Sequence, residues 1–413
     1  MLSEPRLSKI SFSDRTNWKL TQNRFTQALE EVRAAGTTVL DLSVSNPTRA
    51  GLDYDASAIL ASLGSERSLD YDPQAKGLLF AREAVASYYR DRHARLDVAG
   101  VSTDRIILTA STSEGYSYVF KLLCNAGDEL LVPKPSYPLF EFLADLQDVR
   151  LVPYPLIYDH GWQMDFHSLE KAVTERTRGV VIVHPNNPTG SYVSTAELAQ
   201  LNAFCRAHAL SLIVDEVFLD YNLDSNAADT TAADPKHASF ITNHDVLTFT
   251  LSGLSKISAL PQMKVAWVVT TGPEDTAAEA TARLEVIADT YLSMNAPVQW
   301  ALPVLLEQRQ SIQAQLMSRV RANLVELDRQ LAQQTVCERL SVDGGWYAIL
   351  RVPVTRSDED LAIDLVRKKS VIVHPGHFYD FPSDGYLVLS LITPPAEFSE
   401  GIGRVLGYLN SVA

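Results

Sequence analysis

The stretch DVLTFTLSGLSK, residues 245–256, places a buried strand directly before a lysine. Its first seven residues form a near-continuous apolar run, which is typical of a strand that is covered on both faces. The SGLSK segment then follows the carboxyl end of that strand, and open α/β sheets bind ligands at this edge. The sequence therefore indicates that Lys256 borders a ligand site.

Six further apolar runs alternate with helical patterns between about residues 75 and 270. They are RIILT (105–109), ELLVP (129–133), RLVPY (150–154), GVVIVH (179–184), LSLIVD (210–215) and VAWVVT (265–270). Together with the run at 245–251, they predict a large domain with a mostly parallel seven-stranded sheet covered by helices, which is an α/β fold.

The two ends of the chain predict a smaller α+β domain. An amphipathic helix over 21–35 precedes a short strand over 38–42, and a second set of elements follows a long helical stretch at 274–333. This second set consists of WYAILRV (346–352), SVIVHP (370–375), YLVLSLI (386–392) and a helix at about 396–411. We expect residues 1–50 to join the small domain, 51–293 to form the large domain, and 294–413 to form the small C-terminal domain.

Polar residues follow other strands of the predicted sheet at the same edge. Asp215 ends the run LSLIVD, where an ionised carboxylate is costly unless a cationic group meets it. The turn NNPTG (186–190) ends the run VVIVHP, and the residues STS (111–113) begin a helical pattern. Hydroxyl side chains and free backbone amides at a helix N-terminus favour anion binding.

Composition and charge narrow the class of protein. The chain has 413 residues and a net charge of -14, which disfavours nucleic acid as a partner. Its three cysteines lie far apart without metal-ligand spacing, so we expect no disulfide framework, no metal site and a cytoplasmic location. No apolar run is long enough to predict a signal peptide or a membrane span. The sequence also lacks the GxGxxG, GxxxxGK[ST], GxSxG and HExxH motifs.

The ordered set NNPTG, DEVF and SGLSK resembles the pyridoxal-phosphate (PLP) enzymes of fold type I, particularly the class I/II aminotransferases. The resemblance extends from about residue 38 to 411. It implies that Lys256 binds the cofactor covalently and later moves a proton between the substrate Cα and the cofactor C4′. It also implies that Asp215 pairs with the pyridinium nitrogen and that Asn187 donates to the phenolic oxygen.

The same resemblance assigns the remaining cofactor contacts. Tyr137, in the PSYP segment, matches an aromatic residue that stacks on the cofactor ring. Tyr71 matches a tyrosine that reaches the phosphate from the neighbouring subunit, which implies a homodimer with shared active sites. The phosphate would be held by Ser111, Thr112, Ser113, Ser255 and Lys264.

Three positions depart from the pattern of the family. Lys264 stands where relatives usually carry an arginine, so a point charge replaces a bidentate fork. Phe218 replaces a tyrosine that donates to the cofactor. Val388 stands where many relatives carry the arginine that binds the substrate α-carboxylate. Either the correspondence is shifted, or another cation serves, or the substrate lacks a carboxylate there.

Candidate substrate-binding residues follow from the resemblance as well. Ser45 and Arg49 belong to the SNPTRAG loop, which borders the substrate side in relatives. His374 and His377 belong to HPGHF, a segment that lies near the substrate in relatives. Ser45, Arg49 and His377 are therefore predicted to contact the substrate.

The resemblance implies a PLP-dependent aminotransferase that moves an amino group between an amino acid, or an amine, and a keto acid by a ping-pong mechanism. An alternative is a lyase, decarboxylase or cyclase of the same fold, because the departures above can redirect the same carbanion. A lesser alternative is a non-catalytic, ligand-sensing protein, although the chain has no basic DNA-binding extension of the kind such proteins carry.

Overall fold

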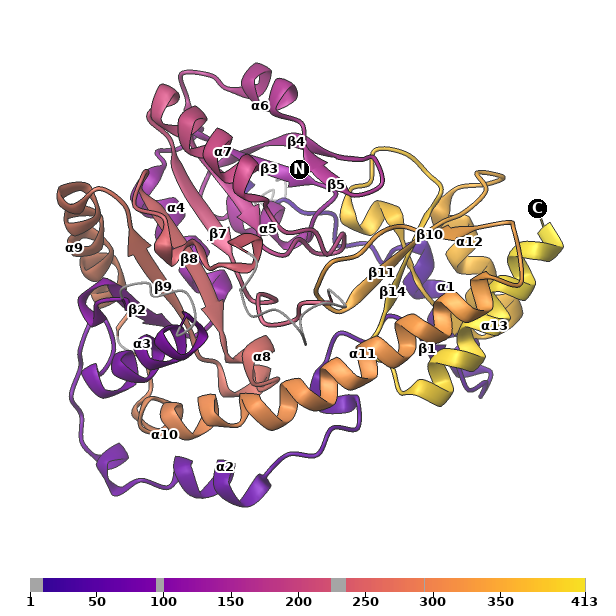
Figure 1. Cartoon of the computed structure of the whole chain (residues 1–413), viewed down its shortest axis with the longest axis horizontal. Helices are drawn as coiled ribbons and strands as arrows, with labels where there is room; N and C mark the ends of the chain where they lie inside the picture. The colour runs from indigo at the N-terminus through magenta and orange to yellow at the C-terminus, as the bar shows by residue number, and fades with distance from the viewer. Residues whose placement is uncertain (1–9, 94–99, 224–234, 293, 413) are drawn as a thin grey trace, which may run out of the picture.

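The computed structural model describes residues 10–93, 100–223, 235–292 and 294–412. A large sheet with the strand order β2-β9-β8-β7-β6-β3-β4-β5 forms the centre of the molecule's larger part (Figure 1). Its strands are β2 (Ile106–Thr109), β3 (Glu129–Lys134), β4 (Arg150–Tyr158), β5 (Trp162–Met164), β6 (Thr177–Val183), β7 (Ser211–Asp215), β8 (Thr248–Gly253) and β9 (Ala266–Thr271). The strands from β8 to β4 run parallel, whereas β9 and β5 are antiparallel to their neighbours.

Seven of these strands match the seven predicted apolar runs, so the predicted α/β class is confirmed. The eighth strand, β5, is a three-residue antiparallel addition at the edge, and the sequence pattern did not predict it. Successive residues of a covered strand pack on opposite faces. In β7, Ile213 packs with α4, α5 and α9, whereas Leu212 and Val214 pack with α6 and α7.

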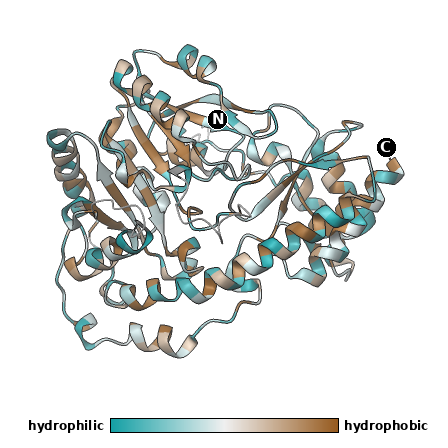
Figure 2. Cartoon of the chain, viewed as in Figure 1, coloured by the Kyte–Doolittle hydropathy of each residue, from teal (hydrophilic) through white to brown (hydrophobic). Residues whose placement is uncertain are grey.

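Helices cover both faces of this sheet, and the strands are its most apolar segments (Figure 2). One face is covered by α4 (Thr112–Leu123), α5 (Leu139–Asp145) and α9 (Glu274–Thr290). The other face is covered by α3 (Leu79–His93), α6 (Phe166–Ala172), α7 (Thr195–His208) and α10 (Ala296–Glu307). Because both faces are buried, only the loops at the sheet edges are left to form a site.

A second, antiparallel sheet has the strand order β10-β11-β14-β13. It consists of β10 (Glu338–Arg339), β11 (Tyr347–Arg351), β14 (Tyr386–Ser390) and β13 (His374–Pro375), and it packs with α1 (Arg24–Ala34), α12 (Asp358–Asp364) and α13 (Pro395–Val412). β1 (Leu40–Asp41) pairs in parallel with β12 (Val371–Ile372), so the N-terminal segment lies against the C-terminal part. The domain boundaries at 50 and 293 stay a prediction.

The long helix α11 (Arg309–Leu331) runs from α10 to the small sheet and joins the larger and smaller parts (Figure 1). The helix α2 (Ala56–Leu63) packs against α10. Within the described ranges, no helix combines the length and the apolar character that a membrane crossing needs.

Candidate active site

The predicted site segments gather at one edge of the large sheet. β2 and β8 are both antiparallel to β9, so they run parallel to each other and to β7, β6 and β3. The carboxyl ends of five strands therefore meet at this edge. The segments that follow them contain residues 111–113, 135–138, 185–190, Asp215 and Lys256. Residue 264, which precedes the antiparallel β9, lies at the same edge.

Gly253 sets the position of Lys256. A Cβ on Gly253 would lie 2.8 Å from the carbonyl oxygen of Val265 and 2.8 Å from the Cβ of Ala266. Glycine therefore permits the close approach of β8 and β9, and α8 (Leu254–Ile257) begins directly after the strand. The hydroxyl of Tyr221 donates to the carbonyl oxygen of Lys256 at 2.6 Å and fixes this short turn.

The Lys256 side chain lies against two aromatic rings. Its Nζ is 4.7 Å from the ring centroid of Trp346 and 5.4 Å from that of Phe218. Burial lowers the pKa of Lys256 from 10.5 to about 8, and the Asp215 carboxylate opposes this shift. A larger fraction of the amine is therefore uncharged near neutral pH, and the uncharged amine is the nucleophile that attacks carbonyl carbons.

Asp215 is partly buried at the end of β7. Its Oδ1 accepts from the Val217 N–H at 3.0 Å, and its Oδ2 accepts from the Tyr116 hydroxyl at 3.2 Å. Burial raises the pKa of Asp215 to about 6, while these hydrogen bonds and Lys256 act in the opposite direction. A buried carboxylate of this kind binds a cationic N–H group well, because the pair avoids the cost of an unpaired charge.

The neighbouring carboxylate, Glu216, points away from the site. It accepts from the Ser239 hydroxyl and from the Phe240 N–H at 2.6 Å. The alternation of side chains at the end of β7 explains why only one of the two adjacent acids faces Lys256. Tyr116 is a site residue that the sequence analysis missed, since it reads there as an ordinary apolar position of α4.

The N-terminus of α4 forms a candidate anion-binding site. Ser111 caps the helix by accepting from the Glu114 N–H at 3.2 Å, and the Glu114 side chain accepts from the Ala110 N–H at 2.6 Å. The N–H groups of Thr112 and Ser113 belong to the first turn, so the helix itself gives them no acceptor. Such a helix start binds phosphate readily.

Lys264 contributes a cation at the same edge. It has a left-handed backbone conformation with φ of 54° and an exposed side chain directly before β9. Within the described part of the chain, no carboxylate lies within ion-pairing distance of its Nζ. Lys264 is therefore available to an anionic ligand, and Ser255 on α8 is the nearest of the predicted phosphate residues in sequence.

Asn187 and Tyr137 complete the set. Asn187 is 7% exposed, and its Oδ1 has no hydrogen-bond partner among the described residues. The turn that carries it is closed by the Gly190 N–H, which donates to Asn186 O at 2.8 Å. The Tyr137 side chain is 45% exposed, and burial, with a smaller contribution from Asp215, raises its pKa.

These residues fit PLP. The buried amine matches the aldehyde, the Asp215 carboxylate matches a pyridinium nitrogen, and the helix start with its serines matches the phosphate. The unpaired amide of Asn187 has hydrogen-bonding capacity left for a ring substituent. Among the described residues, no group of three metal-ligating side chains occurs.

Four of the predicted residues form no hydrogen bond or ion pair with Lys256 in the described part of the chain. Ser45 is exposed on a loop, Arg49 and His377 are exposed in the short 3-10 helices Pro47–Arg49 and Gly376–Tyr379, and Tyr71 is 81% exposed in the segment after α2. Their roles stay predictions.

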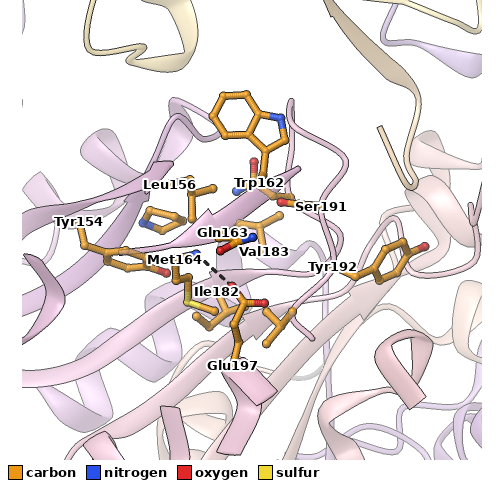
Figure 3. A pocket seen from close by; sticks show the side chains of 13 residues that line it. Tyr154, Leu156, Trp162, Gln163, Met164, Ile182, Val183, Ser191, Tyr192 and Glu197 are labelled. Atoms are coloured by element: carbon orange, nitrogen blue, oxygen red, sulfur yellow. Dashed lines mark hydrogen bonds between the residues drawn. The ribbon is translucent and has the colours of Figure 1, made fainter. Parts of the chain in front are cut away.

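A separate cavity lies beside the NNPTG turn (Figure 3). Its lining includes Trp162, Ser191, Tyr192 and Glu197, and Glu197 Oε1 accepts from the Met164 N–H at 3.0 Å. Lys256 and Asp215 are not among the lining residues, so this cavity is distinct from the candidate site.

The fold and the site together define an enzyme that places a partly buried lysine and a partly buried aspartate at the ligand-binding edge of an α/β sheet. The chain matches the family model of aminotransferase class I and II over residues 37–394, and it belongs to that family. It is an aminotransferase, and the family depends in general on PLP.

Relatives with similar sequences carry more specific names. The chain is 29% identical over 400 residues to alanine aminotransferase of Mycobacterium tuberculosis H37Rv, covering 93% of this chain and 89% of that protein. It is 28% identical over 367 residues to the glutamate-pyruvate aminotransferase of Escherichia coli K12, covering 86% of this chain and 87% of that protein.

Solved structures with the same fold include an Escherichia coli aminotransferase, with a TM-score of 0.83 and 24% identity over 98% of this chain and 99% of that one. Alanine aminotransferase from Pyrococcus furiosus gives a TM-score of 0.82 and 20% identity, with 94% and 96% of the chains covered. These two likenesses support the fold alone.

Proposed function

We propose that this aminotransferase binds PLP through Lys256 and transfers the amino group between glutamate and pyruvate. The observation that carries the proposal is the pair of opposite pKa shifts in one buried site. The pKa of Lys256 falls to about 8 while that of Asp215 rises to about 6, and burial is the main cause of both. Such divergent shifts are typical of catalytic groups. The substrate assignment rests on the names of the relatives at 28–29% identity.

Each residue then has a defined task. When bound, the cofactor supplies an electron sink for the negative charge that develops at the substrate Cα. Lys256 would bind the cofactor aldehyde, and once the substrate amine has displaced it, its freed amine would take the proton from the substrate Cα and return it at C4′. Asp215 holds the pyridine nitrogen in its protonated form, and Tyr116 and the Val217 N–H keep that carboxylate oriented.

The remaining contacts hold the cofactor in place. The Asn187 side-chain NH2 would donate to the phenolic oxygen, and the Tyr137 ring would cover one face of the pyridine. Ser111, Thr112 and Ser113 at the start of α4, Ser255 on α8 and Lys264 before β9 would bind the phosphate. Because Lys264 is a point charge, it attracts the phosphate without fixing its orientation, and the helix start supplies the direction.

A homodimer is part of the proposal. Leu60 on α2 is 67% exposed, Leu69 is 89% exposed, and Tyr71 is 81% exposed. Large apolar side chains that gather on a protruding segment mark a surface that a partner covers. A second copy of the chain that packs on this segment would bring Tyr71 to the phosphate of the neighbouring site.

The test uses the purified protein with PLP. Glutamate and pyruvate should give alanine and 2-oxoglutarate, and glutamate alone should convert the cofactor to pyridoxamine phosphate in stoichiometric amount. Lys256→Ala should abolish both reactions, whereas Lys171→Ala, which changes an exposed lysine on α6, should leave both unchanged. Release of free ammonia without an amino acceptor would instead identify a lyase, and turnover by Lys256→Ala would overturn the assignment of the site.

A further inference from the structure

Val388 leaves open which residue binds the substrate carboxylate in a site that acts on amino acids and 2-oxo acids. Its side chain lies on β14, is 1% exposed and is apolar. An apolar side chain cannot bind a carboxylate. The proposed substrates nevertheless each carry one beside the reacting carbon, so a polar group must bind it.

The cross-strand neighbour of Val388 is a histidine. β13 pairs with β14 in antiparallel register, and His374 lies directly opposite Val388. Directly paired residues present their side chains on the same face, with Cβ atoms about 5 Å apart. His374 therefore brings an imidazole to the face of the small sheet on which Val388 lies.

This face of the small sheet fronts the Lys256 site. Tyr347 pairs with Ser390, two residues from Val388, so its side chain shares the face. The Tyr347 ring lies 6.2 Å from that of Phe218, which contacts the Lys256 ammonium. On its other side, the Tyr347 ring lies 6.4 Å from that of Tyr379.

Tyr379 connects His374 to the large-domain side of the site. Its hydroxyl lies 3.0 Å from His374 Nδ1, and its carbonyl oxygen accepts from the Ser136 N–H at 2.9 Å. Ser136 precedes Tyr137, the residue that we place on the cofactor ring. His374 Nδ1 thus has a partner, while Nε2 has none among the described residues.

Three other cations, Lys134, Arg351 and Arg319, are held by protein groups. Lys134 Nζ pairs with Asp380 at 3.0 Å, and Arg351 pairs with Glu338. The Arg319 guanidinium donates to the carbonyl oxygens of Ala50, Gly51 and Ile392. Arg49 is exposed on the short helix Pro47–Arg49 and is the competing candidate.

We propose that His374 binds the carboxylate of the amino-acid and 2-oxo-acid substrates through Nε2, and that Tyr379 orients the imidazole through Nδ1. This assignment rests on the proposed function. Many relatives carry an arginine at the position of Val388 on β14. In this chain a titratable histidine on the adjacent strand β13 would take its place.

The charge of His374 depends on the ligand. Burial lowers the pKa of His374 in the free protein, and Asp41 on β1 opposes this effect. The other elements that pack around His374 carry three further titratable groups, which are Tyr379, Tyr347 on β11 and Asp358 on α12. The Asp358 carboxylate accepts from the Gly385 and Tyr386 N–H groups.

A bound carboxylate raises the pKa of His374, so substrate binding takes up a proton. The affinity is then greatest below the pKa of the free protein, falls by about tenfold per pH unit between that pKa and the higher pKa of the complex, and levels off above it.

The experiment measures KM for glutamate and pyruvate with the PLP-loaded enzyme as a function of pH. His374→Gln should raise both KM values by about 10- to 100-fold at low pH, the loss typical of a hydrogen bond to a charged group. It should also remove the rise of KM with pH, because glutamine cannot be protonated. Tyr379→Phe should raise KM by a smaller factor, and cofactor content should stay constant in both variants.

Matched variants separate the alternatives. His160→Gln changes a fully exposed histidine in the turn between β4 and β5 and should behave as wild type. An unchanged KM in His374→Gln, with a raised KM in Arg49→Gln, overturns the assignment and leaves the proposed function intact. A wild-type enzyme that transaminates no amino acid overturns the proposed function, and this assignment with it. His374→Phe serves as a second test should His374→Gln fail to fold.

Discussion

Asp215→Asn tests the electrostatics of the site directly. Asparagine has nearly the same size as aspartate, but it lacks the charge that favours the ammonium form of Lys256. We therefore expect the pKa of Lys256 in the cofactor-free protein to fall below its wild-type value of about 8. In the loaded enzyme, the same change removes the partner of the pyridine nitrogen, so transamination should fall by orders of magnitude.

The magnitude follows from the burial of Lys256. Its pKa moves from 10.5 to about 8, and at roughly 1.4 kcal/mol per unit this disfavours the charged form by about 3 kcal/mol. At pH 7 about a tenth of the molecules then carry a free amine, against about 0.03% for an amine that titrates at 10.5. Asp215→Asn should raise the free-amine fraction above a tenth while it abolishes turnover.

The assay is reductive methylation of the cofactor-free protein with formaldehyde over a range of pH. Mass spectrometry of the peptide that contains Lys256 gives the extent of reaction, and the exposed Lys171 provides the reference for the reagent. A wild-type midpoint near 10.5 would refute the role of burial. A midpoint that rises in Asp215→Asn would refute the coupling of the two groups.

Two further predictions concern cofactor and subunit contacts. Lys264→Arg should tighten PLP binding, because a guanidinium can bind two phosphate oxygens at once, whereas Lys264→Met should weaken PLP binding about tenfold. Equilibrium dialysis measures both affinities, and equal affinities would exclude Lys264 from the phosphate site. Light scattering should give the mass of a dimer for the wild type, and Leu69→Lys with Leu60→Lys should shift it toward the monomer; a monomeric wild type would remove the partner that Tyr71 requires.

The large sheet was predictable from the sequence because its strands are buried on both faces. A run such as GVVIVH (179–184) has four consecutive apolar residues, and this pattern can be recognised without knowledge of the neighbouring strands. β5 was missed because three residues in a hairpin with β4 are too few to show a period. The antiparallel sheet gave a weaker signal, since several of its strands have only two residues.

The site was only partly predictable for a related reason. Lys256, Asp215 and the NNPTG turn each follow a strand, so chain order alone brings them to one edge. Trp346 contacts Lys256 from a segment far away in the sequence, and WYAILRV (346–352) reads as an ordinary core strand. Tyr116 reaches Asp215 across the gap between α4 and β7, and no local motif marks that contact.

Val388 shows why the motif of one strand does not identify the group that binds the substrate carboxylate. A sequence motif describes one strand, whereas a ligand meets a face that is built from several strands. In the small sheet, His374 and Val388 share that face because β13 and β14 pair in register. A polar group can therefore move from one strand to its neighbour while the surface that meets the substrate keeps its chemistry. Such a move also changes the control of binding, because an arginine is charged at every physiological pH, whereas the charge of a histidine depends on the pH and on a bound anion.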